Sequence, residues 1–147
     1  KRAQLALGKE GTRLDASDWL AIDQARINAF ADVTSDHQWI HVDPVRAKDG
    51  PFGRTVAHGY LTFSLINNFL PELFQAEGMK MGINYGAEKV RFPAPVLVGS
   101  RVRMVGELVE AKVLDGNAVQ TTVRVKMEVE GSEKPGCVAD ILGRYYF

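Results

Sequence analysis

The sequence predicts an α+β fold in which a curved antiparallel sheet wraps around one central apolar helix. The helix is predicted from Gly59 to Leu70, where apolar residues cover nearly every side of the helical wheel, and Pro71 should end or kink it. Such a helix must be enclosed by other structure. Beyond Lys80 the chain is rich in strand-forming residues, which supply the enclosing sheet.

Four long strands are predicted in this second half, over residues 81–92, 101–113, 119–130 and 137–147. The clearest is 119–130, where apolar and polar residues alternate without a break and give one face to a core and one to water. Turn-forming residues separate the last three strands, so these should form an antiparallel meander. Within 81–92 the apolar phase shifts around Gly86, which indicates a bulge or bend.

Two more helices are predicted before the central one. The first covers 23–34, with Asp23 as its N-cap. Residues 36–40 show neither a helical nor an alternating period and are predicted to form an ordered loop. Asp43 then caps a short helix, with Pro44 at its first position, where a missing N–H costs nothing.

Length and composition indicate one globular domain covering residues 1–147. The 18 basic residues are balanced by 18 acidic ones, so the charge argues for neither a nucleic-acid nor a membrane partner. The single cysteine, Cys137, can form no internal disulfide, and no Cys/His spacing builds a metal site. Lys1 to Gln4 leads into no sustained apolar run, so we expect no secretory signal and a cytoplasmic protein.

Possible acid–base groups gather in one stretch of the chain. All three histidines, His37, His41 and His58, fall within 22 residues, and Asp36 precedes His41 by five positions. An imidazole and a carboxylate are the usual groups for proton transfer near neutral pH. Gly59, at the predicted start of the apolar helix, has a backbone N–H without an intrahelical partner, and this N–H can receive a developing negative charge. Taken singly, Asp36 and His41 would be read as ordinary loop residues.

The same residues carry a resemblance to a known family. The pattern Asp36-x-x-x-x-His41-x-Asp43-Pro44, followed by Ala57-His58-Gly59-Tyr60-Leu61-Thr62, resembles the MaoC-like dehydratases, the (R)-specific enoyl-CoA hydratases of the hotdog fold. The run Asp36-His37-Gln38-Trp39-Ile40-His41, with Gly50-Pro51-Phe52-Gly53 after it, is most similar to the nodulation protein N-like branch. One departure is that Gln38 and Trp39 stand where many of these hydratases have Asn and Pro.

The resemblance implies (R)-specific hydration of trans-2-enoyl-CoA thioesters, or the reverse dehydration, with no cofactor because coenzyme A is part of the substrate. It implies that Asp36 and His41 are catalytic, Asp36 as general base on water and His41 as the group that holds this water and donates a proton. The distribution of the two protons between them stays open. The Gly59 N–H would receive the thioester oxygen, and Asn67 and Ser64 are possible supporting residues.

Two other functions remain open at this point. Related hotdog proteins are acyl-CoA thioesterases, and a non-catalytic acyl-thioester-binding module could keep the motif for structural reasons. A homodimer is expected in each case, because one curved sheet around one helix leaves an edge exposed. Acyl-chain length, the carrier (coenzyme A or acyl carrier protein) and the physiological direction do not follow from the sequence.

Overall fold

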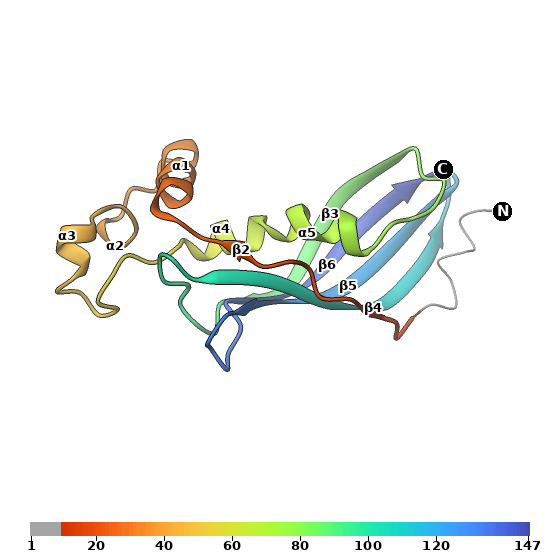
Figure 1. The fold of residues 1–147 in the computed structure, drawn as a ribbon. Helices are drawn as coiled ribbons and strands as arrows, with labels where there is room; N and C mark the ends of the chain where they lie inside the picture. The colour runs from red at the N-terminus through yellow and green to blue at the C-terminus, as the bar shows by residue number, and fades with distance from the viewer. Residues whose placement is uncertain (1–9) are drawn as a thin grey trace.

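The computed structural model describes residues 10–147, and its largest element is a curved antiparallel sheet (Figure 1). The long strands are β3 (Met81–Arg91), β4 (Arg101–Leu114), β5 (Ala118–Val129) and β6 (Cys137–Tyr146). Strands β4, β5 and β6 form the expected meander, and β3 pairs with β6 at one edge. Two short strands, β1 (Arg13–Leu14) and β2 (Leu20–Ala21), pair with β4 at the other edge.

The alternating pattern of the sequence is reproduced as alternating burial. In β5, Val123, Val125 and Met127 are at most 1% exposed, whereas Arg124 and Lys126 between them face outward and are exposed. The pairing of β3 with β6 shifts register between Asn84 and Gly86. The irregularity predicted from the apolar phase around Gly86 is therefore confirmed.

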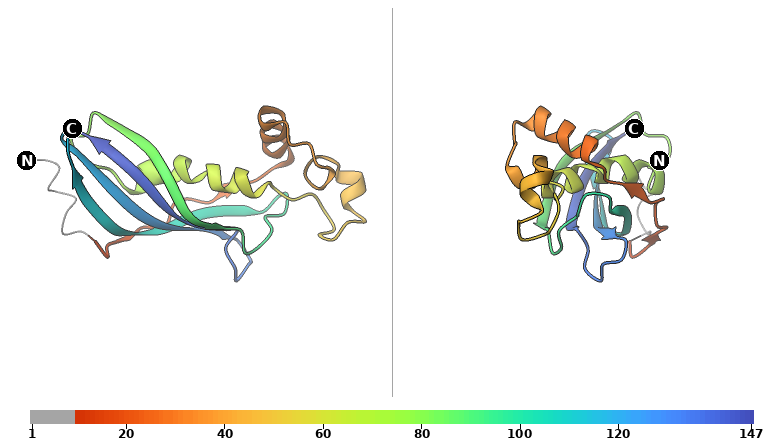
Figure 2. Two further views of the ribbon diagram at one scale, coloured as in Figure 1. Left: turned by 180° about the vertical axis from the view of Figure 1, so that it is seen from behind. Right: turned by 60° about the vertical axis from the view of Figure 1, so that its left-hand side comes forward.

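The central helix consists of two consecutive helices, α4 (Gly59–Ser64) and α5 (Ile66–Leu73), which run along the concave face of the sheet in both views of Figure 2. A single helix was expected. Leu65, between them, keeps a helical backbone and donates its N–H to Leu61, so the direction barely changes. Pro71 does not end the helix, as one of the two predicted outcomes had it, because α5 continues past it to Leu73. The carbonyl that Pro71 leaves without a partner belongs to Asn67, which is exposed to water.

The helices are covered by the sheet on one side only. Leu61, Ile66 and Phe69 are at most 5% exposed and pack into the core, but Tyr60 is 68% exposed. The expectation of a fully enclosed helix is therefore wrong for the single chain. Edge strand β3 is also exposed over almost its whole length, so one side of the helices and the strand beside them form an uncovered surface.

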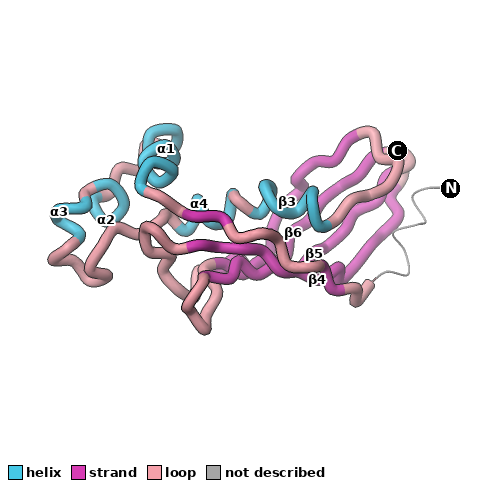
Figure 3. The backbone as a smooth tube through the Cα atoms, viewed as in Figure 1, coloured by secondary structure: helices cyan, strands magenta, loops and turns pink. Residues whose placement is uncertain are grey.

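Three helices lie at one end of the molecule, beyond the sheet (Figure 3). They are α1 (Gln24–Thr34), α2 (Trp39–Val42) and α3 (Pro44–Ala47), and the caps predicted at Asp23 and Asp43 are confirmed. The prediction of a loop over 36–40 is wrong at its end, because a single turn of helix begins at Trp39. One turn is too short to show a period, and its contacts, such as Arg46 stacked on the Trp39 ring, are not visible in the sequence.

Two sequence-based expectations concern membranes and export. Within residues 10–147, no helix combines the length and the apolar character that crossing a bilayer requires. The segment Lys1 to Gln4, from which no secretory signal was expected, lies outside the described residues.

Candidate active site

The position of Asp36 is determined by the end of α1. Ser35 has left-handed backbone angles and ends the helix, and the Asp36 N–H donates to the carbonyl of Ala31 at 3.1 Å. These contacts fix the main chain at Asp36. The side chain remains half exposed, and within residues 10–147 the hydrogen bond that it accepts is a long one of 3.4 Å from the Gln38 N–H. Asp36 therefore presents a carboxylate that is fixed at its base and accessible at its tip.

The imidazole of His41 is buried and held by a main-chain carbonyl. The residue is 7% exposed, and its Nδ1 lies 2.6 Å from the carbonyl oxygen of Val56. A carbonyl oxygen only accepts, so Nδ1 carries the proton and Nε2 presents a lone pair. The main chain around His41 is tied down as well, because Gln24 donates to its carbonyl at 2.7 Å and Val56 donates to that of Ile40 at 3.0 Å.

This environment lowers the pKa of His41 below its ordinary value of 6.5. Burial is the largest cause, since it disfavours the charged imidazolium. The hydrogen bond to Val56 and the negative charge of Asp36 act in the opposite direction, and His58 adds to the lowering. His41 is therefore a neutral imidazole at neutral pH and is ready to accept a proton at Nε2.

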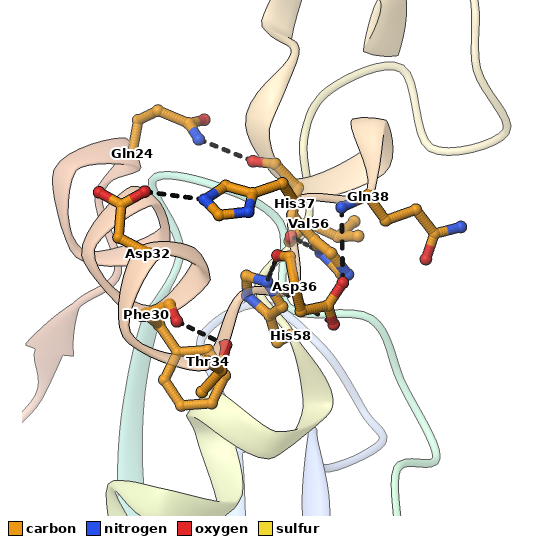
Figure 4. Close-up of polar contacts among 10 residues, drawn as sticks. Gln24, Phe30, Asp32, Thr34, Asp36, His37, Gln38, Val56 and His58 are labelled. Atoms are coloured by element: carbon orange, nitrogen blue, oxygen red, sulfur yellow. Dashed lines mark hydrogen bonds and ion pairs between the residues drawn. The ribbon is translucent and has the colours of Figure 1, made fainter.

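His58, which the sequence analysis left out of the catalytic set, lies against both candidates. It is 3% exposed, and its ring stacks on that of His41 with centroids 3.8 Å apart and an angle of 22°. Its Nε2 lies 3.0 Å from the main-chain oxygen of Asp36 and 4.0 Å from a carboxylate oxygen of the same residue (Figure 4). His58 follows His41 by 17 positions and Asp36 by 22, so these contacts could not be predicted from a local sequence pattern.

Gly59 begins α4 directly after His58. Among residues 10–147 its N–H has no hydrogen-bond acceptor, as expected for the first residue of a helix. A side chain would not fit here easily: an added Cβ would lie 2.9 Å from the Phe92 ring. Glycine thus allows the aromatic ring to pack closely over the helix start, beside the unpaired N–H.

The two possible supporting residues lie further along the helices. Ser64 donates its hydroxyl to the Tyr60 carbonyl at 2.7 Å. Both Ser64 and Asn67 line a cavity of about 480 Å³ between the helices and β3, together with apolar groups such as Phe63 and Val90. Asp36 and His41 do not line this cavity. Instead they lie near the start of α4, toward the helical end of the molecule.

Asp36, His41 and His58 form one compact group. One carboxylate oxygen and one nitrogen from each ring lie within 4.8 Å of one another. His37, the remaining histidine, points elsewhere and pairs with Asp32 at 2.8 Å on the exposed side of α1. The structure therefore brings together the carboxylate and imidazole that the sequence singled out, and adds a second imidazole to them.

Comparison with known proteins places this chain in a family. A family model described as the MaoC like domain matches residues 6–131. The chain belongs to the MaoC-like dehydratase family. It is 53% identical over 135 residues to the 3-hydroxyacyl-thioester dehydratase Z of Mycobacterium tuberculosis, covering 92% of this chain and 89% of that protein. The nodulation protein N of Rhizobium leguminosarum bv. viciae is 43% identical over 135 residues, covering 88% and 82%. The predicted family and its hydratase/dehydratase enzyme class are confirmed.

Solved structures agree on the fold. The (R)-hydratase of Aeromonas caviae superimposes with a TM-score of 0.71 at 24% identity, covering 91% of this chain and 94% of that one. The 3R-hydroxyacyl-ACP dehydratase complex HadBC of M. tuberculosis contains a chain with a TM-score of 0.73 at 15% identity, covering 93% and 98%. The MaoC-like chain therefore has the hotdog fold that its sequence predicts.

Proposed function

We propose that this protein catalyses the reversible, (R)-specific hydration of trans-2-enoyl-CoA thioesters to 3-hydroxyacyl-CoA, with Asp36 and His41 as the acid–base pair. One observation carries the proposal: a carboxylate oxygen of Asp36 and a ring nitrogen of His41 lie within 4.8 Å of each other, one accessible and the other buried and neutral. The family membership supports the same reaction.

The spacing of the two groups suits one bound water. Hydrogen bonds of about 2.8 Å from a single water to each group span such a separation. Both groups are acceptors in the resting state, Asp36 as a carboxylate and His41 through Nε2, so each can hold one hydrogen of the water. Its oxygen lone pairs then face the substrate, which is the orientation that attack on the β carbon requires.

The same proton is removed from the water and later added to the substrate, so the enzyme ends each turnover in its starting protonation state. In the hydration direction, the water oxygen bonds to the β carbon, the π electrons move toward the thioester oxygen, and one member of the pair takes a proton from the water. That proton returns to the α carbon as the thioester carbonyl re-forms. We propose that the Gly59 N–H stabilises the negative charge that develops on the thioester oxygen between these two steps.

The cavity beside α4 and α5 is our candidate site for the acyl chain. Part of its wall comes from α4, the helix that starts at Gly59. The wall includes Phe63, Ile66 and Ile141 as well as Ser64 and Asn67. The first three offer an apolar wall. Ser64 and Asn67 would then contact the acyl part of the substrate and support the site from there.

We further propose that the enzyme is a homodimer. Three large apolar side chains of the edge strand β3, Met81, Ile83 and Tyr85, are 41 to 52% exposed, and no strand within residues 10–147 pairs with its outer edge. A long exposed apolar edge is stabilised by pairing with a second chain. The acyl cavity adjoins this edge, so a partner would also close it. Sedimentation showing a stable monomer at working concentration contradicts this proposal.

We also propose that the reaction uses no metal, although Asp36, His41 and His58 are grouped closely enough to suggest one. A metal lies in the plane of each imidazole that binds it, and the planes of two stacked rings 3.8 Å apart do not meet at a nearby point. In addition, His41 Nδ1 and His58 Nε2 face carbonyl oxygens. The group is better suited to proton transfer than to coordination.

The test is a hydration assay with trans-2-enoyl-CoA substrates of several chain lengths, followed by loss of the enoyl-thioester absorbance. We expect turnover and an (R)-3-hydroxyacyl product, identified by chiral chromatography. No turnover at any chain length, or an (S) product, refutes the proposal. Release of free thiol from a saturated acyl-CoA would instead identify a thioesterase, and binding measured by calorimetry without turnover would identify a non-catalytic module.

A further inference from the structure

We infer that His58 is a positioning residue, which holds the Asp36 carboxylate and the His41 ring in their working arrangement. The inference rests on the proposed function, because it assigns His58 a role that acts through the two proposed catalytic groups.

The first support is that His58 contacts both groups at once. Its ring covers one face of the His41 ring, while its Nε2 lies 3.0 Å from the main-chain oxygen of Asp36 and 4.0 Å from a carboxylate oxygen. On another side lies Phe30 of α1, with ring centroids 4.9 Å apart. His58 therefore occupies the space between α1, α2 and α4, where a displacement would move Asp36 and His41 relative to each other.

The second support is the tautomer that these contacts require. The Asp36 main-chain oxygen can only accept, so His58 carries its proton on Nε2. The same N–H faces the carboxylate oxygen at 4.0 Å, which draws the negative end of Asp36 toward it. One donor thus restrains both the main chain and the side chain of Asp36.

The third support is that one ring nitrogen of His58 is buried without a hydrogen-bond partner in the part of the chain that the structure describes. The Nδ1 of His58 is buried and has no hydrogen-bond partner among residues 10–147, and the side chain does not cap α4. A leucine of similar volume would fill this space without burying an unpaired acceptor, which is unfavourable. Packing alone therefore does not explain a histidine here, whereas its Nε2–H does.

The test compares His58→Leu with His58→Gln in the enoyl-CoA hydration assay. Both variants lose the stacked ring, but glutamine keeps an N–H donor at about the position of Nε2 and leucine keeps none. We expect His58→Leu to lower kcat about 10- to 100-fold, the size of effect that a misplacement of about 1 Å produces, with KM within about twofold. Glutamine should restore kcat to within about fivefold of wild type. Equal losses in the two variants, or no loss in either, overturn the inference.

A double variant separates action through Asp36 from an independent effect. If His58 acts by positioning Asp36, then adding His58→Leu to Asp36→Asn should cause little further loss, because the group being positioned has already been disabled. Losses that are fully additive both with Asp36→Asn and with His41→Gln would overturn the inference. The single variant Asp36→Asn separates the two hypotheses: full turnover in it refutes the proposed function, whereas an inactive Asp36→Asn beside a fully active His58→Leu refutes only the role of His58.

A measurement on the unmodified protein covers the case in which a variant fails to fold. Nitrogen-15 NMR of the histidine side chains distinguishes the two neutral tautomers. At neutral pH we expect His58 with its proton on Nε2 and His41 with its proton on Nδ1. A His58 protonated on Nδ1 alone has no donor for Asp36 and overturns the inference.

Discussion

Replacing Gly59 with alanine adds one methyl group at the start of α4, and the structure gives the size of the disturbance. The new Cβ would lie 2.9 to 3.1 Å from three atoms of the Phe92 ring, whereas ordinary contacts begin at 3.4 Å, so helix start and ring must separate by about 0.5 Å. The Phe92 ring packs edge-on against the Tyr60 ring of α4, so the ring does not move alone and the helix start takes up part of the separation. We estimate this cost at about 1 kcal/mol, offset in part by the preference of helices for alanine over glycine, which reaches roughly 1 kcal/mol only in a helix interior.

The effect should therefore appear in activity rather than in stability. A shift of this size moves the Gly59 N–H away from the thioester oxygen and should lower kcat about 10- to 100-fold, with an unfolding midpoint close to wild type. Enoyl-CoA hydration kinetics and thermal melts measure the two quantities. Adding Phe92→Ala removes the clash and should recover part of kcat. A Gly59→Ala enzyme with wild-type kcat would refute the role of this N–H.

Three further results follow from the site. Asp36→Asn and His41→Gln should each lower kcat about 10²- to 10⁴-fold without changing the circular dichroism spectrum; retained activity removes that residue from the mechanism. Because burial lowers the pKa of His41, the unfolded chain binds a proton there more readily, so the contribution of His41 to stability is present above the ordinary value of 6.5 and is lost as the pH drops below it. Thermal melts across this range should show this loss reduced in His41→Gln. Dialysis against EDTA should leave hydration kinetics unchanged, and recovery of activity only after zinc addition would contradict the metal-free proposal.

The elements that could be predicted are those encoded by neighbouring residues. The cap at Asp23 and the alternation of β5 depend on residues only a few positions apart, and both are found where expected. The phase shift around Gly86 was visible for the same reason. Asp36 and His41 could be proposed as a pair from the sequence because both lie on one short segment whose pattern resembles a known family, and the structure brings the two side chains close together.

What could not be predicted depends on contacts between distant segments. The role we infer for His58 rests on a stack with His41 and a hydrogen bond to Asp36, neither of which has a periodic signature. The single turn beginning at Trp39 was missed because it is too short to show a helical pattern. The exposure of Tyr60 was also unexpected, since an apolar wheel does not show which side the sheet leaves open.

The placement of α1, α2 and α3 beyond the end of the sheet affects how the protein opens. Helix α1 is anchored in the main core through Ile27, whereas α2 and α3 contact chiefly α1 and each other at the far end of the molecule (Figure 1). The segment after them is attached by the Val56–Leu97 bridge and by the bond from the Ala57 N–H to the Val96 carbonyl. Regions with few contacts to the main core can open locally while the rest stays folded. Amide hydrogens of α2 should thus exchange with deuterium sooner than those at the centre of β5. The acid–base pair would then be dismantled by mild denaturant before the sheet unfolds.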